Sequence, residues 1–216
     1  MAELRHKYFA GSQEAFRAES RRIAQYGCGL IGLCDLIIYL TERSWREKAE
    51  GQTGVHRGRS YEAFVHKIDD RMARAYRKLG LNGWSMARAF NRRAKKRGWP
   101  LRARWGVPME TLVQEVNAML LKDIPVIMSV GPGFRSPDGT KGIALYAEDG
   151  VTRIDRASDH YFTVIGLITR AGRRFFRVAS WGRIYLVDTE TYEEGLRRTP
   201  VLFRGFTSIL KIADRS

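Results

Sequence analysis

The stretch Gln25-Tyr-Gly-Cys-Gly-Leu-Ile-Gly-Leu-Cys-Asp-Leu-Ile-Ile-Tyr-Leu40 decides how the rest of the chain is interpreted. After Cys28, apolar residues recur every three or four positions, which predicts an amphipathic helix with one buried face. These residues are Leu30, Leu33, Ile37 and Leu40. We expect the helix to begin at Cys28 and to end near Glu42.

Cys28 at a helix start has a clear chemical meaning. Aligned peptide dipoles and free N–H groups place partial positive charge there, which favours the nucleophilic thiolate. Gly27 and Gly29 on either side let backbone and substrate approach the sulfur without an intervening Cβ. The alternative is that Cys28 is a small buried hydrophobe, as we expect for Cys34.

Composition limits the class of protein. The 216 residues fit a single domain, residues 1–216, and 44% hydrophobic residues with five Trp can form a substantial core. The net charge of +15 indicates attraction to an acidic partner.

Several kinds of site and segment have no signature in this sequence. Cys28 and Cys34 are six residues apart on one predicted helix, so they face different sides and do not predict a disulfide. With His160 they lack zinc-ligand spacing, and we expect no metal site and no cofactor. The N-terminus has no apolar signal core and no apolar run could span a bilayer. We therefore expect a soluble, non-secreted, cytoplasmic protein.

The N-terminal part of the chain reads as mainly helical, over about residues 12–122. The predicted elements are a helix Gln13–Ala24 capped by Ser12, the helix from Cys28, a loop over 43–60, a helix Tyr61–Leu79, a helix Trp84–Arg97 stopped by Gly98, a short strand Leu101–Trp105, and a helix Met109–Leu121.

The pattern changes to strands over residues 123–216. The predicted strands are Pro125–Val130, Gly142–Glu148, Val151–Ile154, His160–Ile168, Arg174–Ala179, Ile184–Val187 and Phe206–Ala213, with a helix near Glu190–Arg197. Asp149-Gly150 and Ala171-Gly172 are hairpin turns. A helical half followed by an antiparallel sheet predicts the α+β class.

The segment 56–106 carries most of the charge. It contains fifteen Lys or Arg against Glu62, Asp69 and Asp70, a local excess of twelve positive charges. We interpret the cations as the solvated faces of two helices. The alternative is a phosphate-binding surface, but no aromatic-glycine RNA signature or zinc-finger spacing accompanies them, and nucleic acid is the weakest partner hypothesis.

A nucleophilic cysteine needs a base, which is usually a histidine that is distant in sequence. His6, His56 and His66 lie in charged or basic surroundings and are expected at the surface. His160 opens an apolar strand, where an imidazole can pair with a thiol and lower the thiol pKa. A histidine that merely marks the strand end is the alternative.

The order of these motifs resembles the papain-like cysteine peptidases, and especially their bacteriocin-leader (double-glycine) peptidase branch. Cys28-Gly29 before an apolar helix resembles the Cys-Gly of that superfamily, and Ile124–Val130 resembles the strand before the histidine strand. His160-Tyr-Phe-Thr-Val-Ile-Gly-Leu resembles its His-aromatic-x-Val-x-Gly segment. The resemblance spans about residues 22–213 and implies a papain-like fold.

The resemblance implies roles for particular residues. Cys28 would attack a carbonyl as a thiolate, His160 would accept and return its proton, and the Cys28 N–H would help to hold the oxyanion. The family also uses a glutamine about six residues before the cysteine. Arg22 occupies that place here, so Gln25, three residues before, becomes the oxyanion candidate.

The residue that orients the histidine departs from the family pattern. The family has Asn or Asp just before a Trp-Gly-type turn, and this chain has Ala179 in Ala179-Ser-Trp-Gly182. Ser180 could orient His160 if the register shifts by one. Asp159, next to His160, would point to the opposite face of a strand.

The sequence therefore predicts a peptidase or amide hydrolase with a Cys28–His160 dyad and a peptide or amide substrate. One alternative is acyl transfer by the same dyad. A second is a papain-like module with weak or no catalysis that holds an acidic partner on segment 56–106.

Overall fold

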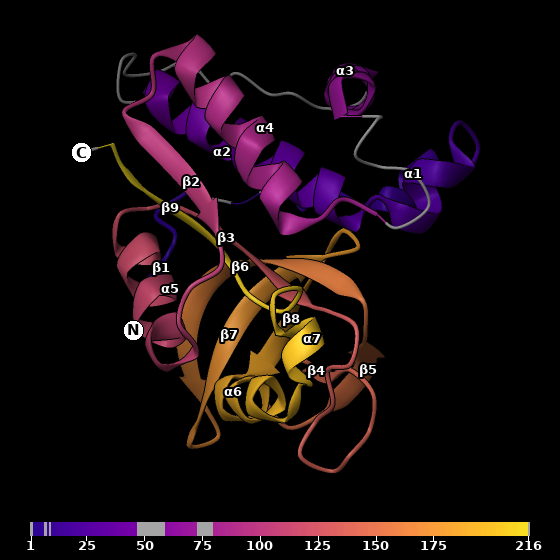
Figure 1. The fold of residues 1–216 in the computed structure, drawn as a ribbon, viewed down its shortest axis with the longest axis vertical. Helices are drawn as coiled ribbons and strands as arrows, with labels where there is room; N and C mark the ends of the chain where they lie inside the picture. Colours follow the sequence, from indigo (N-terminus) through magenta and orange to yellow (C-terminus); the bar gives the residue numbers. More distant parts are fainter. Residues whose placement is uncertain (1, 7, 9, 47–58, 73–79, 216) are drawn as a thin grey trace.

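The computed structural model describes residues 2–6, 8, 10–46, 59–72 and 80–215. Figure 1 shows helices α1 to α4 gathered at one end of the molecule and an antiparallel sheet at the other. The predicted α+β class is confirmed. Buried apolar residues from both parts form one main core cluster.

Helix α2 (Cys28–Arg46) begins at the predicted residue and extends past the predicted end. Residues 29–41 are all buried, so the prediction of a single buried face was wrong. The helix packs against α1, α3 and α4 and against strands of the sheet. Its described side chains are apolar almost all round, with Asp35 and Thr41 the exceptions, which is the pattern of a central helix.

The predicted helix Gln13–Ala24 is in fact two short helices. They are the 3₁₀ helix η1 (Gln13–Phe16) and α1 (Arg21–Tyr26). Ser12 caps η1, and its hydroxyl accepts a hydrogen bond from the Glu14 N–H at 3.2 Å. The chain breaks because Ser20 starts the second helix, accepting a bond from the Ile23 N–H at 3.3 Å.

The next two helices carry the basic segment. Helix α3 (Arg59–Met72) covers the start of the predicted Tyr61–Leu79 helix, whose remainder lies outside the described residues. Of the predicted loop 43–60, residues 47–58 also lie outside them. Helix α4 (Gly83–Arg97) ends as predicted, because Gly98 adopts a left-handed φ of 67°.

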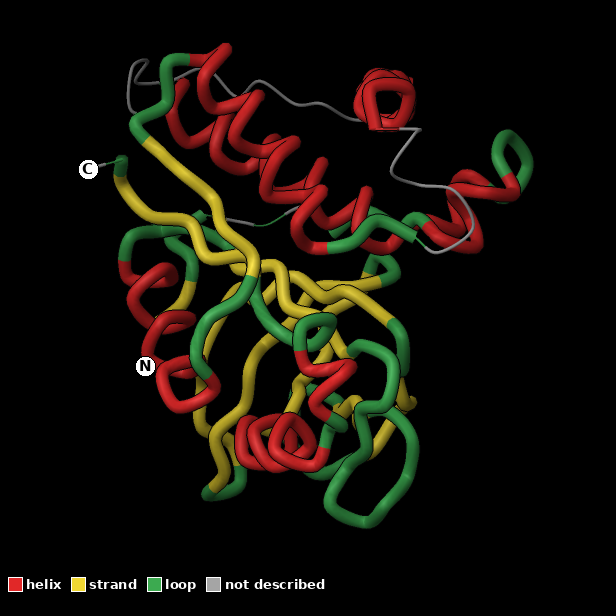
Figure 2. Tube along the Cα trace, viewed as in Figure 1, coloured by secondary structure: helices red, strands yellow, loops and turns green. Residues whose placement is uncertain are grey.

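The described residues form one seven-stranded antiparallel sheet, seen at the lower end of Figure 2. Its strands are β1 (Ala2–Glu3), β3 (Val126–Val130), β4 (Ile143–Tyr146), β5 (Arg153–Ala157), β6 (His160–Arg170), β7 (Arg173–Ser180) and β8 (Arg183–Asp188). The order is β1-β6-β7-β8-β4-β5, and β3 also pairs with β6.

Strand β6 occupies a central place in this sheet. Strand β7 pairs along one edge of β6, and β3 pairs along the other edge so that Val130 lies opposite His160. All five residues of β3 are buried. The predicted apolar strand that starts at His160 is therefore confirmed, and His160 itself pairs with Val130 of β3.

A second, two-stranded sheet links the two parts of the molecule. Strand β2 (Leu101–Trp105) pairs with β9 (Leu210–Asp214). The last strand was predicted from Phe206 but begins four residues later. Residues before it cross to β3 instead, where the Ser129 N–H donates to the Ser208 carbonyl at 2.9 Å.

Short helices complete the fold around the sheet. They are η3 (Met109–Thr111), α5 (Leu112–Leu121), α6 (Thr189–Arg198) and α7 (Val201–Arg204). The predicted helix Met109–Leu121 therefore has a 3₁₀ first turn. Strand β1 and helix α7 were not predicted, because two and four residues are too few to show a periodicity.

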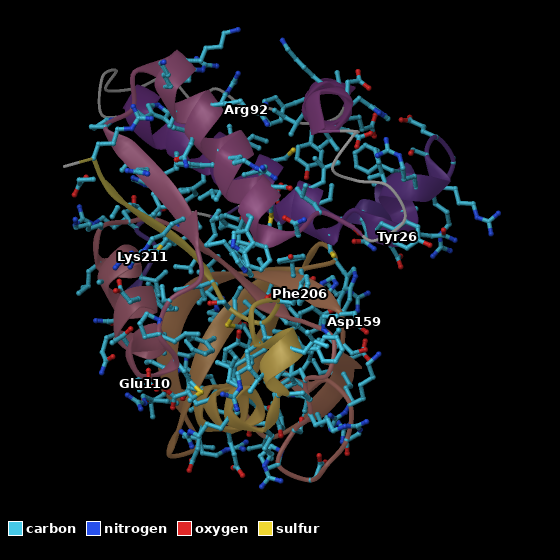
Figure 3. The ribbon with its side chains drawn as sticks, viewed as in Figure 1. Tyr26, Arg92, Glu110, Asp159, Phe206 and Lys211 are labelled. Atoms are coloured by element: carbon cyan, nitrogen blue, oxygen red, sulfur yellow. The ribbon has the colours of Figure 1, made fainter. Side chains whose placement is uncertain are left out.

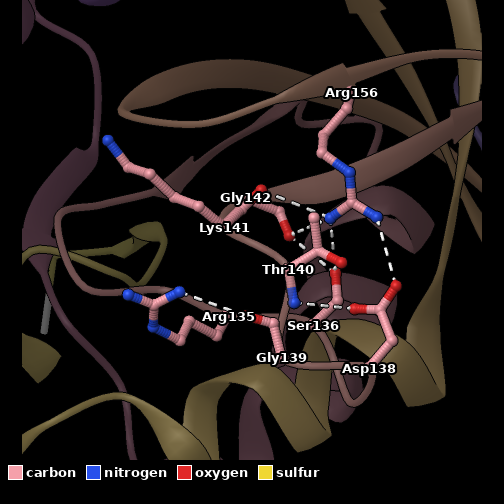
Figure 4. A network of polar contacts seen from close by, with 8 residues as sticks. All are labelled: Arg135, Ser136, Asp138, Gly139, Thr140, Lys141, Gly142 and Arg156. Atoms are coloured by element: carbon pink, nitrogen blue, oxygen red, sulfur yellow. Dashed lines mark hydrogen bonds and ion pairs between the residues drawn. The ribbon is translucent and has the colours of Figure 1, made fainter.

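Arg156 on β5 fixes the loop that joins β3 to β4 (Figure 4). Its guanidinium donates to the Ser136 hydroxyl at 3.1 Å and to the Gly142 carbonyl at 2.9 Å. An ion pair to Asp138 at 3.6 Å adds a third contact. In the same loop, Lys141 is the residue before Gly142, and its side chain pairs with Asp159 at 2.6 Å. The network therefore reaches the residue just before His160.

Candidate functional site

A small cavity lies between the start of α2 and the strands β6 and β7. It is lined by Ala10, Gly11, Gln13, Cys28, Ile31, Gly32, Asp35, His160, Tyr161, Thr163, Ala179, Ser180 and Trp181. Its volume is about 20 Å³, which is room for one water molecule. Cys28, His160 and Ser180, three of the four predicted site residues, meet at this cavity. Figure 3 labels Tyr26, two residues before Cys28, and Asp159, one before His160, on the same side of the molecule.

Cys28 is the first residue of α2, as predicted. Burial raises the pKa of its thiol, and the N–H groups of Tyr161, Gly29 and Cys28 itself act in the opposite direction. Because the burial effect is larger, the thiol is neutral in this conformation. The expected lowering of the pKa by the helix start is present but is outweighed.

His160 is held on three sides. Its Nε2 lies 2.6 Å from the Ser180 Oγ. The ring stacks on Trp181 with centroids 4.1 Å apart and contacts Phe162 edge-on at 5.0 Å. Burial lowers the pKa of His160 to about 3, so the imidazole is neutral. A fixed neutral imidazole can accept a proton from a neighbouring acid.

Ser180 occupies the position from which the imidazole can be oriented. It is the last residue of β7, and both it and His160 are buried. Ala179, which pairs with Thr163 in the sheet, cannot make this contact. The Ser180 hydroxyl is therefore the side-chain hydrogen-bond partner of the His160 imidazole.

Trp181 shields this hydrogen bond from one side. It opens the turn between β7 and β8 with a φ of 48°, which is uncommon for a bulky residue. Gly182 follows with a φ of 73°. The turn directs the indole onto His160, and strain of this kind is concentrated at functional positions.

Gln25 does not reach the cavity. It lies in the last turn of α1 and is exposed, so its assignment as the oxyanion donor is wrong. Gln13 lines the cavity instead, and its Nε2 donates to the Ala24 carbonyl at 2.9 Å. The Gln13 Oε1 is buried with no hydrogen-bond partner. No local motif marks Gln13, because it comes from fifteen residues before Cys28.

Asp35 is a site residue that the sequence interpretation missed. It lies on α2 two turns after Cys28, is 5% exposed and lines the same cavity. Its Oδ2 accepts a bond from the Gly11 N–H at 2.8 Å, and its Oδ1 accepts one from the Tyr61 hydroxyl at 2.7 Å. Burial raises the pKa of this carboxyl to about 7. In the sequence, Asp35 stands out as the one acidic residue within the mainly apolar run 29–41.

The remaining candidates lie elsewhere. His6 is near Asp123, and His66 pairs with Glu19 at 3.1 Å. His56 lies outside the described residues. Asp159 pairs with Lys141 rather than with His160. Cys34 is fully buried in the core, as predicted.

The described part of the chain lacks two further features. It holds no cluster of three or more His, Cys, Asp or Glu residues arranged to bind a metal ion. None of its helices combines the length and the apolar character that a bilayer crossing requires.

No family model, curated protein or solved structure gives a significant match to this chain.

Proposed function

We propose that the chain is a papain-like thiol hydrolase that cleaves a peptide or amide bond through an acyl-enzyme on Cys28. One observation carries the proposal: Cys28 at a helix start and His160 line the same cavity, and His160 Nε2 is bonded to Ser180 at 2.6 Å. When Nε2–H donates to Ser180, Nδ1 is the basic nitrogen. It is then the atom that takes the thiol proton.

The reaction then follows from ordinary nucleophilic catalysis. His160 Nδ1 removes the proton from Cys28, and the sulfur attacks the carbonyl carbon of the substrate. The C–N bond breaks as the imidazolium returns its proton to the departing nitrogen, leaving a thioester on Cys28. Water, deprotonated by His160, hydrolyses the thioester. An amine that attacks in place of water would give acyl transfer with the same groups.

Main-chain N–H groups supply a place for negative charge. Those of Cys28, Gly29 and Tyr161 all lower the pKa of the thiol, so they face the sulfur. Donors arranged in this way also stabilise an oxyanion that forms next to the sulfur. Gln13 Nε2 has a second proton beyond the one bonded to Ala24 and is our candidate for a further donor.

Cleavage of a defined mixture of synthetic peptides, followed by mass spectrometry, tests this function. The variant Cys28→Ser and the variant His160→Ala should each lose cleavage by about a hundredfold or more, since general base catalysis alone contributes that much. Cys34→Ser is the matched control and should retain cleavage. Equal activity in Cys28→Ser and Cys34→Ser would refute the proposal.

A second candidate function is the binding of an acidic partner on the basic segment. No Asp or Glu occurs between Asp70 and Glu110. Seven cations on α4 and β2 form no ion pair with any residue that the structure describes. They are Arg88, Arg92, Lys95, Lys96, Arg97, Arg102 and Arg104. Unopposed charge of this kind attracts polyanions.

Titration with a fluorescent poly-glutamate peptide tests the second candidate. We expect binding that weakens as salt rises, and that is lost in Arg88→Gln/Arg92→Gln/Lys95→Gln. The matched control is a triple variant of exposed arginines at the far end of the sheet, Arg170→Gln/Arg174→Gln/Arg197→Gln. Equal loss in the two triple variants would show that only net charge matters.

A further inference from the structure

The candidate site is too narrow for a substrate in this structure, although Cys28 itself is partly exposed. The cavity beside Cys28 and His160 has a volume of about 20 Å³. Pockets that bind small molecules are far larger, on the order of 300 Å³ or more. A substrate carbonyl with its flanking chain therefore does not fit beside the sulfur until something moves.

The residues that close the site come from the N-terminal segment. Ala10, Gly11 and Gln13 line the cavity opposite Cys28 and His160. The segment runs between β1, which is paired into the sheet, and η1, so it is anchored at both ends. Residues 10–12 belong to no helix or strand.

The segment is bonded to both walls of the site through Gly11. The Gly11 N–H donates to Asp35 Oδ2 on α2 at 2.8 Å. The Gly11 carbonyl accepts from the Gly182 N–H at 3.2 Å, in the turn that carries Trp181. One residue thus joins the element that holds the thiol to the turn that shields the imidazole.

Close packing at Gly11 leaves no room for a side chain. A Cβ at this position would lie 2.0 Å from the Tyr61 hydroxyl and 2.9 Å from Asp35 Oδ1. The Tyr61 hydroxyl is itself held by Asp35 at 2.7 Å, so it cannot simply turn aside. We therefore expect a side chain at this position to push the segment away from Asp35 and Tyr61.

We propose that Ala10–Gln13 is a strap that closes the thiol site, held down by Asp35 and Gly182, and that it must lift before substrate reaches Cys28. Restriction of access to the Cys28 sulfur by the strap does not depend on Cys28 being catalytic. Only the entry of a substrate rests on the proposed function. With the strap lifted, the thiol and the imidazole become more exposed to water, and the burial that keeps both neutral is relieved.

Thiol alkylation in the native protein tests the strap. In Gly11→Ala, Cys28 should react with N-ethylmaleimide about tenfold faster than in the wild type, because two main-chain bonds that favour the closed state are lost. Gly11→Val should react faster still. Gly195→Ala, whose Cβ would lie 2.2 Å from the Phe134 ring outside the cavity lining, is the matched overpacking control and should react at the wild-type rate. Cys34 in the core is the internal reference and should not change.

Equal Cys28 rates in the wild type and both glycine variants would overturn the proposal. A parallel rise at Cys34 would also overturn it, since that marks general loosening. Amide hydrogen exchange in the unaltered protein gives a second test: the Gly11 and Gly182 amides should exchange together, faster than the Val164 amide in β6. Exchange of all three only by global unfolding would show that the strap does not open. Neither experiment requires turnover, so their outcome is separate from that of the peptide-cleavage test.

Discussion

Replacing Ser180 by Ala removes the one hydrogen bond seen on His160 Nε2, a contact of 2.6 Å between two buried side chains. A buried donor left without a partner costs about 1–3 kcal/mol. We expect the free energy of unfolding to fall by that amount. If the bond persists into the transition state, the same loss slows Cys28-dependent cleavage by about 5- to 150-fold.

Ser129→Ala is the matched control for Ser180→Ala. Ser129 is also buried, and its hydroxyl donates to the Phe206 carbonyl at 2.6 Å and accepts from the Ser208 N–H at 3.2 Å, away from His160. Both variants should lose stability in urea unfolding, Ser129→Ala by at least as much as Ser180→Ala. Only Ser180→Ala should slow cleavage and change the His160 tautomer, which ¹⁵N NMR shifts of the imidazole report.

Either of two results would contradict a role for Ser180 in orienting His160. Cleavage that slows equally in both serine variants would show that the effect is a general loss of stability. An unchanged His160 tautomer in Ser180→Ala would show that Ser180 does not select which nitrogen carries the proton.

Three further predictions concern stability and local order. The pKa of the Asp35 carboxyl is about 7 in the folded protein and 3.8 in the reference state, so the folded protein binds more protons between these two pH values. Protonated Asp35 therefore contributes at most about 4 kcal/mol to the free energy of unfolding. This contribution is fully present below pH 4 and is lost as the pH rises towards 7. Urea unfolding of Asp35→Asn should lack this decline relative to the wild type, and parallel pH curves would contradict it. Gly83→Ala would place a Cβ 1.8 Å from the Trp105 ring, so overpacking should lower the free energy of unfolding by about 1–3 kcal/mol; an unchanged unfolding midpoint would contradict that. Arg156→Gln should speed amide exchange at Gly142 without changing the global unfolding midpoint, and unchanged exchange would show that the guanidinium does not hold the loop.

Local patterns predicted much of the fold. The start of α2 at Cys28, the Gly98 stop of α4 and the hairpin turn at Asp149-Gly150 all depend on neighbouring residues and are confirmed. The break between η1 and α1 was missed, because Ser20 could either continue a helix or cap a new one. Local propensity alone did not separate these two choices.

The parts that depend on distant contacts could not be predicted. Strand β9 pairs with β2 across more than a hundred residues, and this pairing moves its start from Phe206 to Leu210. The burial of α2 on all sides depends on which elements pack on it. Periodicity reports a preference for burial, but it does not identify the partner.

The candidate site likewise contains residues marked by a local sequence feature and residues brought in only by distant contacts. Cys28, His160 and Ser180 each stand beside a recognisable local feature, namely a helix start, a strand start and a tight turn. Gln13 and the strap reach the site only through tertiary structure, and Gln25 was assigned by spacing alone. Sequence spacing therefore located the nucleophile and base candidates but not the groups that cover them.

The central claim, that His160 is the base for the Cys28 thiol, is tested most directly by the pH dependence of Cys28 alkylation. Iodoacetamide labelling is followed by peptide mass spectrometry in the wild type and in His160→Ala, with Cys34 as the reference. We predict that Cys28 reacts faster in the wild type than in His160→Ala between pH 5 and 9, whereas the buried Cys34 stays unlabelled in both proteins. Cys28 curves that coincide in the two proteins from pH 5 to 9 would contradict the claim.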